Sequence, residues 1–171
     1  DLINLKDSLQ ALFDGNILNP SEGRTVSHTI YRDKIASERF QIIFSERKRI
    51  KSFLEKRNIL KTIKNVICLS IGGSRLGPEM LNEFQSLEGS INIHFCSSFD
   101  LLELSDVLGR CNQKETIIFV SSKSFETTEI LKNLDHAKSW YSQYPNIDFY
   151  EHLYGISANT SAMTAYGIKE S

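Results

Sequence analysis

Hydroxyl side chains gather where an apolar run of the sequence ends. Residues 116–121, TIIFVS, are typical of a buried strand, and Ser122, Lys123, Ser124 and Thr127 follow it closely. An anion such as phosphate needs several hydrogen-bond donors that converge from a compact stretch of backbone. This spacing across a strand-to-helix turn can wrap hydroxyls and backbone N–H groups around one anion. Each charge-assisted hydrogen bond would contribute about 1.5–3 kcal/mol.

Helix capping is the competing interpretation of the same residues. Serine and threonine are favoured N-caps, and Glu126 and Glu129 would suit the first turn of a helix. Capping accounts for one hydroxyl, whereas this stretch carries three hydroxyls at ligand spacing together with a lysine. We therefore favour an anion site at this strand end.

A glycine-rich stretch, SIGGSRLGP at residues 70–78, follows an earlier apolar run. Gly72 and Gly73 would let the backbone adopt positive φ and approach a ligand closely, and Ser74 adds a hydroxyl. Pro78 is expected in the first turn of the next helix, whose N-terminus would face an anion. A tight turn that needs glycine for steric reasons alone explains the residues equally well. The glycine spacing does not match a dinucleotide-binding fingerprint.

The elements that must position these residues alternate between strand and helix. Apolar runs without polar alternation predict buried strands at VICLSI, INIHFC, TIIFVS and FYEHLYGIS, with helical stretches between them. The first three begin about 25 residues apart, close to the short end for βαβ units. This pattern predicts an α/β fold, a three-layer αβα sandwich with a mainly parallel sheet. Right-handed crossovers then bring all strand carboxyl ends to one edge, where ligands bind.

The N-terminal third is expected to be helical. One helix should end before Gly15, and a second should run from about residue 37 to 56. The first helix has an apolar face formed by Leu5, Leu9, Leu12 and Phe13. The second is expected to face inward with Phe40, Ile43, Phe44, Ile50, Phe53 and Leu54. Residues 1–171 are interpreted as a single domain, with a helical part at 1–58 and the parallel-sheet core at 59–171.

Composition excludes several classes of partner. The 171 residues carry a formal net charge of -1, so no general attraction to nucleic acid or an anionic membrane is expected. No apolar run approaches the roughly 18 residues of a membrane span, and the expectation is a soluble cytoplasmic protein. Cys68, Cys96 and Cys111 are expected to be buried free thiols. The histidines show no metal-ligand spacing.

Three ordered motifs resemble those of the glucose-6-phosphate isomerase family. IGGSRLGP is similar to the signature I-G-G-S-x-L-G-P, and SKSFETTE to the loop S-K-[TS]-F-x-T-x-E. Residues 19–32, NPSEGRTVSHTIYR, follow N-x-[TS]-E-x-R-x-V-x-H-x-x-x-R, and HFCSSFD matches F-V-S-N-x-D more loosely. The resemblance covers nearly the whole chain. It implies a sugar-isomerase (SIS) domain, with a sheet of about five parallel strands between helices.

The resemblance also implies a chemistry: cofactor-free interconversion of glucose 6-phosphate and fructose 6-phosphate, in which a glutamate moves a proton between C2 and C1. The family's later motifs, which carry the catalytic groups, do not occur in this sequence. The expectation is therefore the N-terminal domain of a longer, homodimeric enzyme, inactive by itself, with no catalytic residue here. The positions that match the family's phosphate-binding residues are Gly73, Ser74, Ser122, Lys123, Ser124 and Thr127.

Some positions depart from the family pattern. Arg75 stands where an aspartate or aromatic residue is common, and it is expected to point away from the phosphate. Glu126 replaces a threonine or serine, as in the S-x-S-G-E-T of other SIS domains, although Phe125 replaces the glycine of that pattern. A stand-alone SIS module that senses a phosphosugar is the alternative function, favoured by Glu126 and the chain length. The motif at residues 19–32 and IGGSRLGP oppose it. A structural homologue without a ligand is a third possibility.

Overall fold

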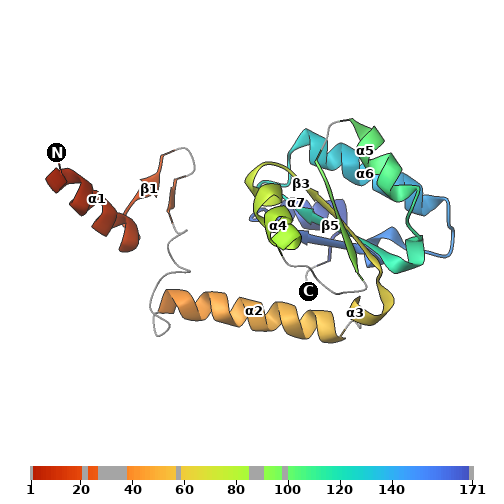
Figure 1. Ribbon diagram of the computed structural model, residues 1–171, viewed down its shortest axis with the longest axis horizontal. Helices are drawn as coiled ribbons and strands as arrows, with labels where there is room; N and C mark the ends of the chain where they lie inside the picture. The colour runs from red at the N-terminus through yellow and green to blue at the C-terminus, as the bar shows by residue number, and fades with distance from the viewer. Residues whose placement is uncertain are drawn as a thin grey trace. The chain divides into compact units, whose positions relative to one another are not determined.

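The computed structural model divides the chain into two compact units, Asp1–Arg57 and Asn58–Ser171, which we describe separately. This division lies one residue from the boundary expected between the helical part and the sheet core. That the two units form a single domain stays a prediction. The structure describes residues 2–20, 23–26, 38–56, 59–84, 91–97 and 100–169 (Figure 1).

The described residues of the first unit form two helices and a short antiparallel pair of strands. Its elements are α1 (Leu2–Phe13), β1 (Leu18–Asn19), β2 (Arg24–Thr25) and α2 (Glu38–Lys56). Gly15 follows α1 with a φ of 73°. Phe44 and Ile50 of α2 were expected to face inward and are exposed instead. Three residues of the apolar face of α1 are exposed as well: Leu5, Leu9 and Phe13. The helical period of a sequence identifies an apolar face, but it does not specify what covers that face. Most of the motif at residues 19–32 lies outside the described residues.

The second unit is built from alternating strands and helices. Its strands are β3 (Asn65–Ser70), β4 (Asn92–Cys96), β5 (Thr116–Ser121) and β6 (Leu153–Ile156). Its helices are α3 (Ile59–Thr62), α4 (Gly73–Phe84), α5 (Leu101–Leu108), α6 (Thr128–Ser142) and α7 (Thr160–Tyr166), with 3₁₀ turns at η2 (Gln113–Glu115) and η3 (Phe149–Glu151).

The four strands form one parallel sheet in the order β4-β3-β5-β6. This confirms the α/β fold with a parallel sheet flanked by helices, although the described residues supply four strands where about five were expected. The chain moves from β3 to β4 on one side, and then back across to β5 on the other. The strand order therefore reverses between β3 and β5, and in such sheets ligands bind at that switch point. Ser70 and Ser121 are register partners at the carboxyl ends of these two strands.

The core lies on the face of the sheet that packs against α5 and α6. Ile67, Leu69, Ile118 and Val120 are fully buried on this face. Tyr141 of α6 is also fully buried, and its hydroxyl donates to the Thr116 carbonyl at 2.6 Å. Because parallel crossovers are right-handed, α4 covers the opposite face. On that face Val66, Cys68, Phe119 and Tyr154 are only half-buried.

Two element boundaries differ from the sequence prediction. The helix expected from Pro78 begins at Gly73, so Pro78 lies inside α4. The Gly72 carbonyl starts this helix early, because it accepts the N–H groups of both Arg75 and Leu76 at 3.0 Å. The run FYEHLYGIS is a strand only in its second half. Asp148 accepts the N–H of Tyr150 at 2.9 Å and thereby caps the 3₁₀ turn η3 before β6.

All three cysteines are free, with Cys96 buried and Cys68 and Cys111 half-buried. Burial raises the pKa of Cys68 to about 11 and that of Cys96 to about 12, so both remain protonated at neutral pH. In the described part of the chain, no helix is both long and apolar enough to cross a membrane. The same residues contain no group of three or more His, Cys, Asp or Glu side chains arranged to hold a metal ion.

Candidate functional site

Residues 122–127 form a loop after β5 that is closed by its own hydroxyl groups. Ser122 is only 6% exposed, and its hydroxyl accepts the N–H of Phe125 at 3.1 Å. The Ser124 hydroxyl accepts the N–H of Glu126 at 3.3 Å. A hydroxyl that accepts a hydrogen bond still carries a proton, so each of these O–H groups can donate to a ligand.

Thr127 occupies the N-cap position of α6, but its hydroxyl makes no capping hydrogen bond. Its carbonyl accepts the N–H of Leu131 at 3.1 Å, as the first turn of a helix requires. The helix starts without any contribution from this hydroxyl, so capping does not account for the threonine. Its side chain is half-buried beside N–H groups of the first turn that have no acceptor within the helix.

Phe125 gives the loop its unusual shape. Its φ is 54°, and among the described residues it is the one non-glycine residue with positive φ. This left-handed conformation costs about 1–2 kcal/mol for a residue that has a Cβ. The side chain is 2% exposed, and its ring packs edge-on against Tyr166 of α7 with the ring centroids 5.8 Å apart. Burial of the ring therefore offsets the strain, at the position where the wider SIS pattern has glycine.

The carbonyl groups of the loop point toward the segment that follows β6. The Lys123 carbonyl accepts the Ala158 N–H at 3.1 Å and the Ser157 hydroxyl at 3.0 Å. The Ser124 carbonyl accepts the side-chain amide of Asn159 at 3.0 Å. In a trans peptide the N–H points opposite to the carbonyl, so the N–H groups after these carbonyls face away from this segment.

The glycine-rich stretch supplies the start of α4. Gly72 has a φ of 59°, so the turn itself favours glycine there. Gly73 does not have positive φ, and a Cβ built on it would meet no atom within 4 Å. Steric crowding within the chain therefore does not explain the second glycine, and the space over its Cα is open. The N–H groups of Gly73 and Ser74 lie in the first turn of α4, where no acceptor within the helix is available.

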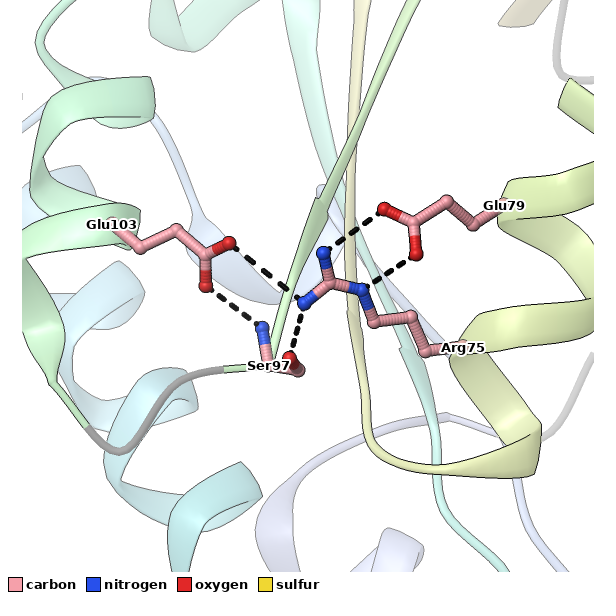
Figure 2. A network of polar contacts seen from close by, with 4 residues as sticks. All are labelled: Arg75, Glu79, Ser97 and Glu103. Atoms are coloured by element: carbon pink, nitrogen blue, oxygen red, sulfur yellow. Dashed lines mark hydrogen bonds and ion pairs between the residues drawn. The ribbon is translucent and has the colours of Figure 1, made fainter. Parts of the chain in front are cut away.

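A network around Arg75 connects α4 to the neighbouring strand and helix (Figure 2). The guanidinium donates to both carboxylate oxygens of Glu79, at 2.8 and 2.9 Å, and to the Ser97 hydroxyl. It also lies 3.8 Å from Oε1 of Glu103, whose other carboxylate oxygen, Oε2, accepts the N–H of Ser97 at 3.1 Å. The guanidinium thus lies toward β4, whereas the hydroxyl-rich loop follows β5 on the other side of β3.

The structure brings the predicted site residues to one edge of the sheet, in two groups that follow adjacent strands. One group is Gly73 and Ser74; the other is Ser122, Lys123, Ser124 and Thr127. Sequence reasoning missed Ser157 and Asn159, which hold the second loop, and it missed α7. The available signal was a helix-capping pattern, an asparagine before SAMTAY and a glycine after it.

Comparison with known proteins gives a consistent set of relatives. The phosphoglucose isomerase family model matches residues 1–171. The chain is 33% identical to the glucose-6-phosphate isomerase of Pseudomonas fluorescens and 31% identical to that of Pseudomonas savastanoi pv. phaseolicola. Each alignment covers 98% of this chain and 34% of the relative, so the chain spans about a third of the length of these curated relatives.

Two solved structures share the fold. A crystal structure of glucose-6-phosphate isomerase from Chlamydia trachomatis matches with a TM-score of 0.78 at 25% identity, covering 90% of this chain and 32% of that one. A hypothetical protein from Thermus thermophilus matches with a TM-score of 0.58 at 22% identity, over 71% of this chain and 31% of that one. The second match supports the fold alone.

Replacing Phe125 should separate the energetic cost of its positive φ from the stabilisation that its buried ring provides. Phe125→Ala removes a buried ring and is expected to lower the free energy of unfolding by about 3–5 kcal/mol. Phe125→Gly removes the same ring but accepts positive φ. We therefore expect it to be more stable than Phe125→Ala by roughly 0.5–1 kcal/mol in urea denaturation. At buried Phe149, by contrast, the Ala variant should be more stable than the Gly variant. If the same variant is the more stable one at both positions, the proposed strain at Phe125 is contradicted.

Acid should weaken the Arg75 network. The hydrogen bond from Arg75 lowers the pKa of Glu79 below its ordinary value of 4.5. A carboxylate whose pKa is lowered in the folded state stabilises that state above the unfolded pKa, and the effect is lost as the pH falls through the folded value. The melting temperature of wild type should therefore exceed that of Glu79→Gln at pH 7, and the gap should narrow as the pH falls below 4.5. A gap that does not narrow with falling pH, or a matching profile for the control Glu83→Gln, would rule out this linkage.

Proposed function

The chain belongs to the phosphoglucose isomerase family, and on that premise we propose that it forms the phosphate-binding part of a glucose-6-phosphate isomerase. The intact enzyme would interconvert glucose 6-phosphate and fructose 6-phosphate without a cofactor. The relatives that match nearly the whole chain are isomerases, which supports this function over that of a phosphosugar sensor. The catalytic groups would come from parts of the enzyme outside these 171 residues.

The observation that carries the proposal is the use of hydroxyls in the loop after β5. The hydroxyls of Ser122 and Ser124 accept backbone N–H groups. Thr127 occupies the N-cap position of α6, but its hydroxyl makes no capping hydrogen bond. The Ser122 and Ser124 hydroxyls therefore still have a proton to donate, and the Thr127 hydroxyl is not committed to capping. A phosphate dianion is the ligand that this concentration of donors suits best, because each oxygen accepts several hydrogen bonds.

The two strand ends would act together on one phosphate. The first turn of α4 contributes the N–H groups of Gly73 and Ser74, and the open space over Gly73 allows the anion to approach the backbone. The loop after β5 contributes hydroxyls, and Lys123 contributes positive charge. Arg75 is paired with the carboxylates of Glu79 in α4 and Glu103 in α5, which offsets part of their negative charge.

Phosphate binding would serve the chemistry by orienting the sugar. The phosphate does not react, so its binding energy is available to fix the position of the sugar carbons relative to the catalytic groups. By analogy with the family, we further propose that residues 1–171 act as one domain and that the intact enzyme is a cytoplasmic homodimer.

Titration of this chain with glucose 6-phosphate and with glucose tests the site directly. Calorimetry should detect weak binding of the phosphorylated sugar and none of glucose at the same concentration. Loss of two hydroxyls in Ser124→Ala combined with Thr127→Ala should weaken binding at least 10-fold, because each bond to a charged group contributes about 1.5–3 kcal/mol. A coupled isomerase assay of the chain alone should show no turnover.

The matched control removes two hydroxyls at the far end of α6, by Ser139→Ala and Ser142→Ala, and should bind like wild type. Equal affinity for the two sugars, or an unchanged affinity in the Ser124 and Thr127 double variant, would remove the phosphate site. Robust turnover by the 171-residue chain would refute the assignment of catalysis to other parts of the enzyme.

A further inference from the structure

We infer that Asn159 is a positioning residue for the phosphate site, because its side chain holds the loop after β5 in the shape that binds the anion. Its amide nitrogen donates to the Ser124 carbonyl at 3.0 Å, although the two residues lie 35 positions apart in the sequence. This role rests on the proposed function of the loop and adds to it a residue that does not touch the ligand.

Both ends of the Asn159 side chain are in use. The carbonyl oxygen Oδ1 accepts the N–H of Ala162 at 3.1 Å and caps α7, while Nδ2 reaches across to Ser124. The chemistry of the partners fixes this orientation, because an N–H requires an acceptor and a carbonyl requires a donor. Serine or aspartate would cap the helix as well as asparagine does, but neither would supply the amide donor.

The residues beside Asn159 hold the preceding peptide in the same way. The Ser157 hydroxyl accepts the N–H of Asn159 and donates to the Lys123 carbonyl, both at 3.0 Å. The N–H of Ala158 donates to the same carbonyl at 3.1 Å. Three donors from residues 157–159 therefore hold two successive carbonyl groups of the loop.

Holding these carbonyls determines where the donors of the loop point. A carbonyl oxygen facing a dianion would repel it, and the opposite faces of the same trans peptides carry N–H groups. The N–H of Ser124 is turned away from residues 157–159, and the N–H of Phe125 reaches the Ser122 hydroxyl. That hydroxyl keeps its own proton available for donation. Rotation of either peptide would replace a donor with an acceptor.

Helix α7 provides a rigid support for this contact. Tyr166 packs its ring against Phe125, and its hydroxyl donates to Asp135 of α6 at 2.8 Å. The loop is thus attached to α7 at both ends of the helix, by Asn159 at the start and by Tyr166 at the finish. The left-handed Phe125 makes the second of these attachments and directly follows Ser124, which makes the first.

Two substitutions of Asn159 separate the loop contact from the cap. Asn159→Asp and Asn159→Ser both keep an acceptor for Ala162 and both lose the donor to Ser124; only the first adds charge. We expect both to bind glucose 6-phosphate at least about 3- to 10-fold more weakly than wild type, as the loss of one hydrogen bond predicts. Melting temperatures should change little. The amide resonances of Ser124 and Phe125 should shift even without ligand, which a role in capping alone would not cause.

Asn112→Asp is the matched control. Asn112 caps η2 by accepting the N–H of Lys114 at 3.0 Å, before the start of β5 and away from the loop. This variant should bind glucose 6-phosphate like wild type and leave the Ser124 and Phe125 resonances in place.

The outcomes distinguish this role from the proposed function. If wild type binds no glucose 6-phosphate, the phosphate site itself is refuted. If wild type binds and both Asn159 variants bind equally well, the site stands and the positioning role is refuted. If neither Asn159 variant folds, Ser157→Ala decides, because it removes a donor to the Lys123 carbonyl and leaves the Asn159 side chain in place. Weaker binding by Ser157→Ala supports the role, and unchanged binding overturns it.

Discussion

The candidate site depends on turning the carbonyl groups of Lys123 and Ser124 away from the carboxyl edge of the sheet. Every peptide carries a donor and an acceptor on opposite faces, so a loop can attract an anion only if its acceptors are satisfied elsewhere. In this chain the donors of Ser157, Ala158 and Asn159 satisfy them. The strained φ of Phe125 and the burial of its ring are part of the same arrangement.

The sheet topology adds the second half of the site. The strand order reverses between β3 and β5, so the loop after β5 and the start of α4 follow neighbouring strands. Arg75 then connects the first turns of α4 to Ser97 after β4 and to Glu103 in α5. A loop held through α7 and a helix held through α5 thus follow adjacent strands at one edge of the sheet.

The sequence alone predicted what local patterns encode, and it missed what depends on distant contacts. Apolar runs predicted β3, β4 and β5, because buried parallel strands need no polar alternation. The site residues could be proposed from the hydroxyls and glycines that follow these strands. Asn159 could not be found in this way, since its partner Ser124 is remote in sequence. The positive φ of Phe125 could not be predicted, because the ring that offsets its cost packs against Tyr166, which is distant in the sequence. The early start of α4 was also missed, because it depends on hydrogen bonds to the carbonyl of Gly72.

The central claim is that two strand ends bind one anion, and an NMR titration of the chain with inorganic phosphate tests it most directly. The amide resonances of Gly73 and Ser74 in α4, and of Ser124 and Thr127 after β5, should shift together along one binding curve with one dissociation constant. Shifts confined to one of the two groups, or different dissociation constants for them, would contradict a shared phosphate site.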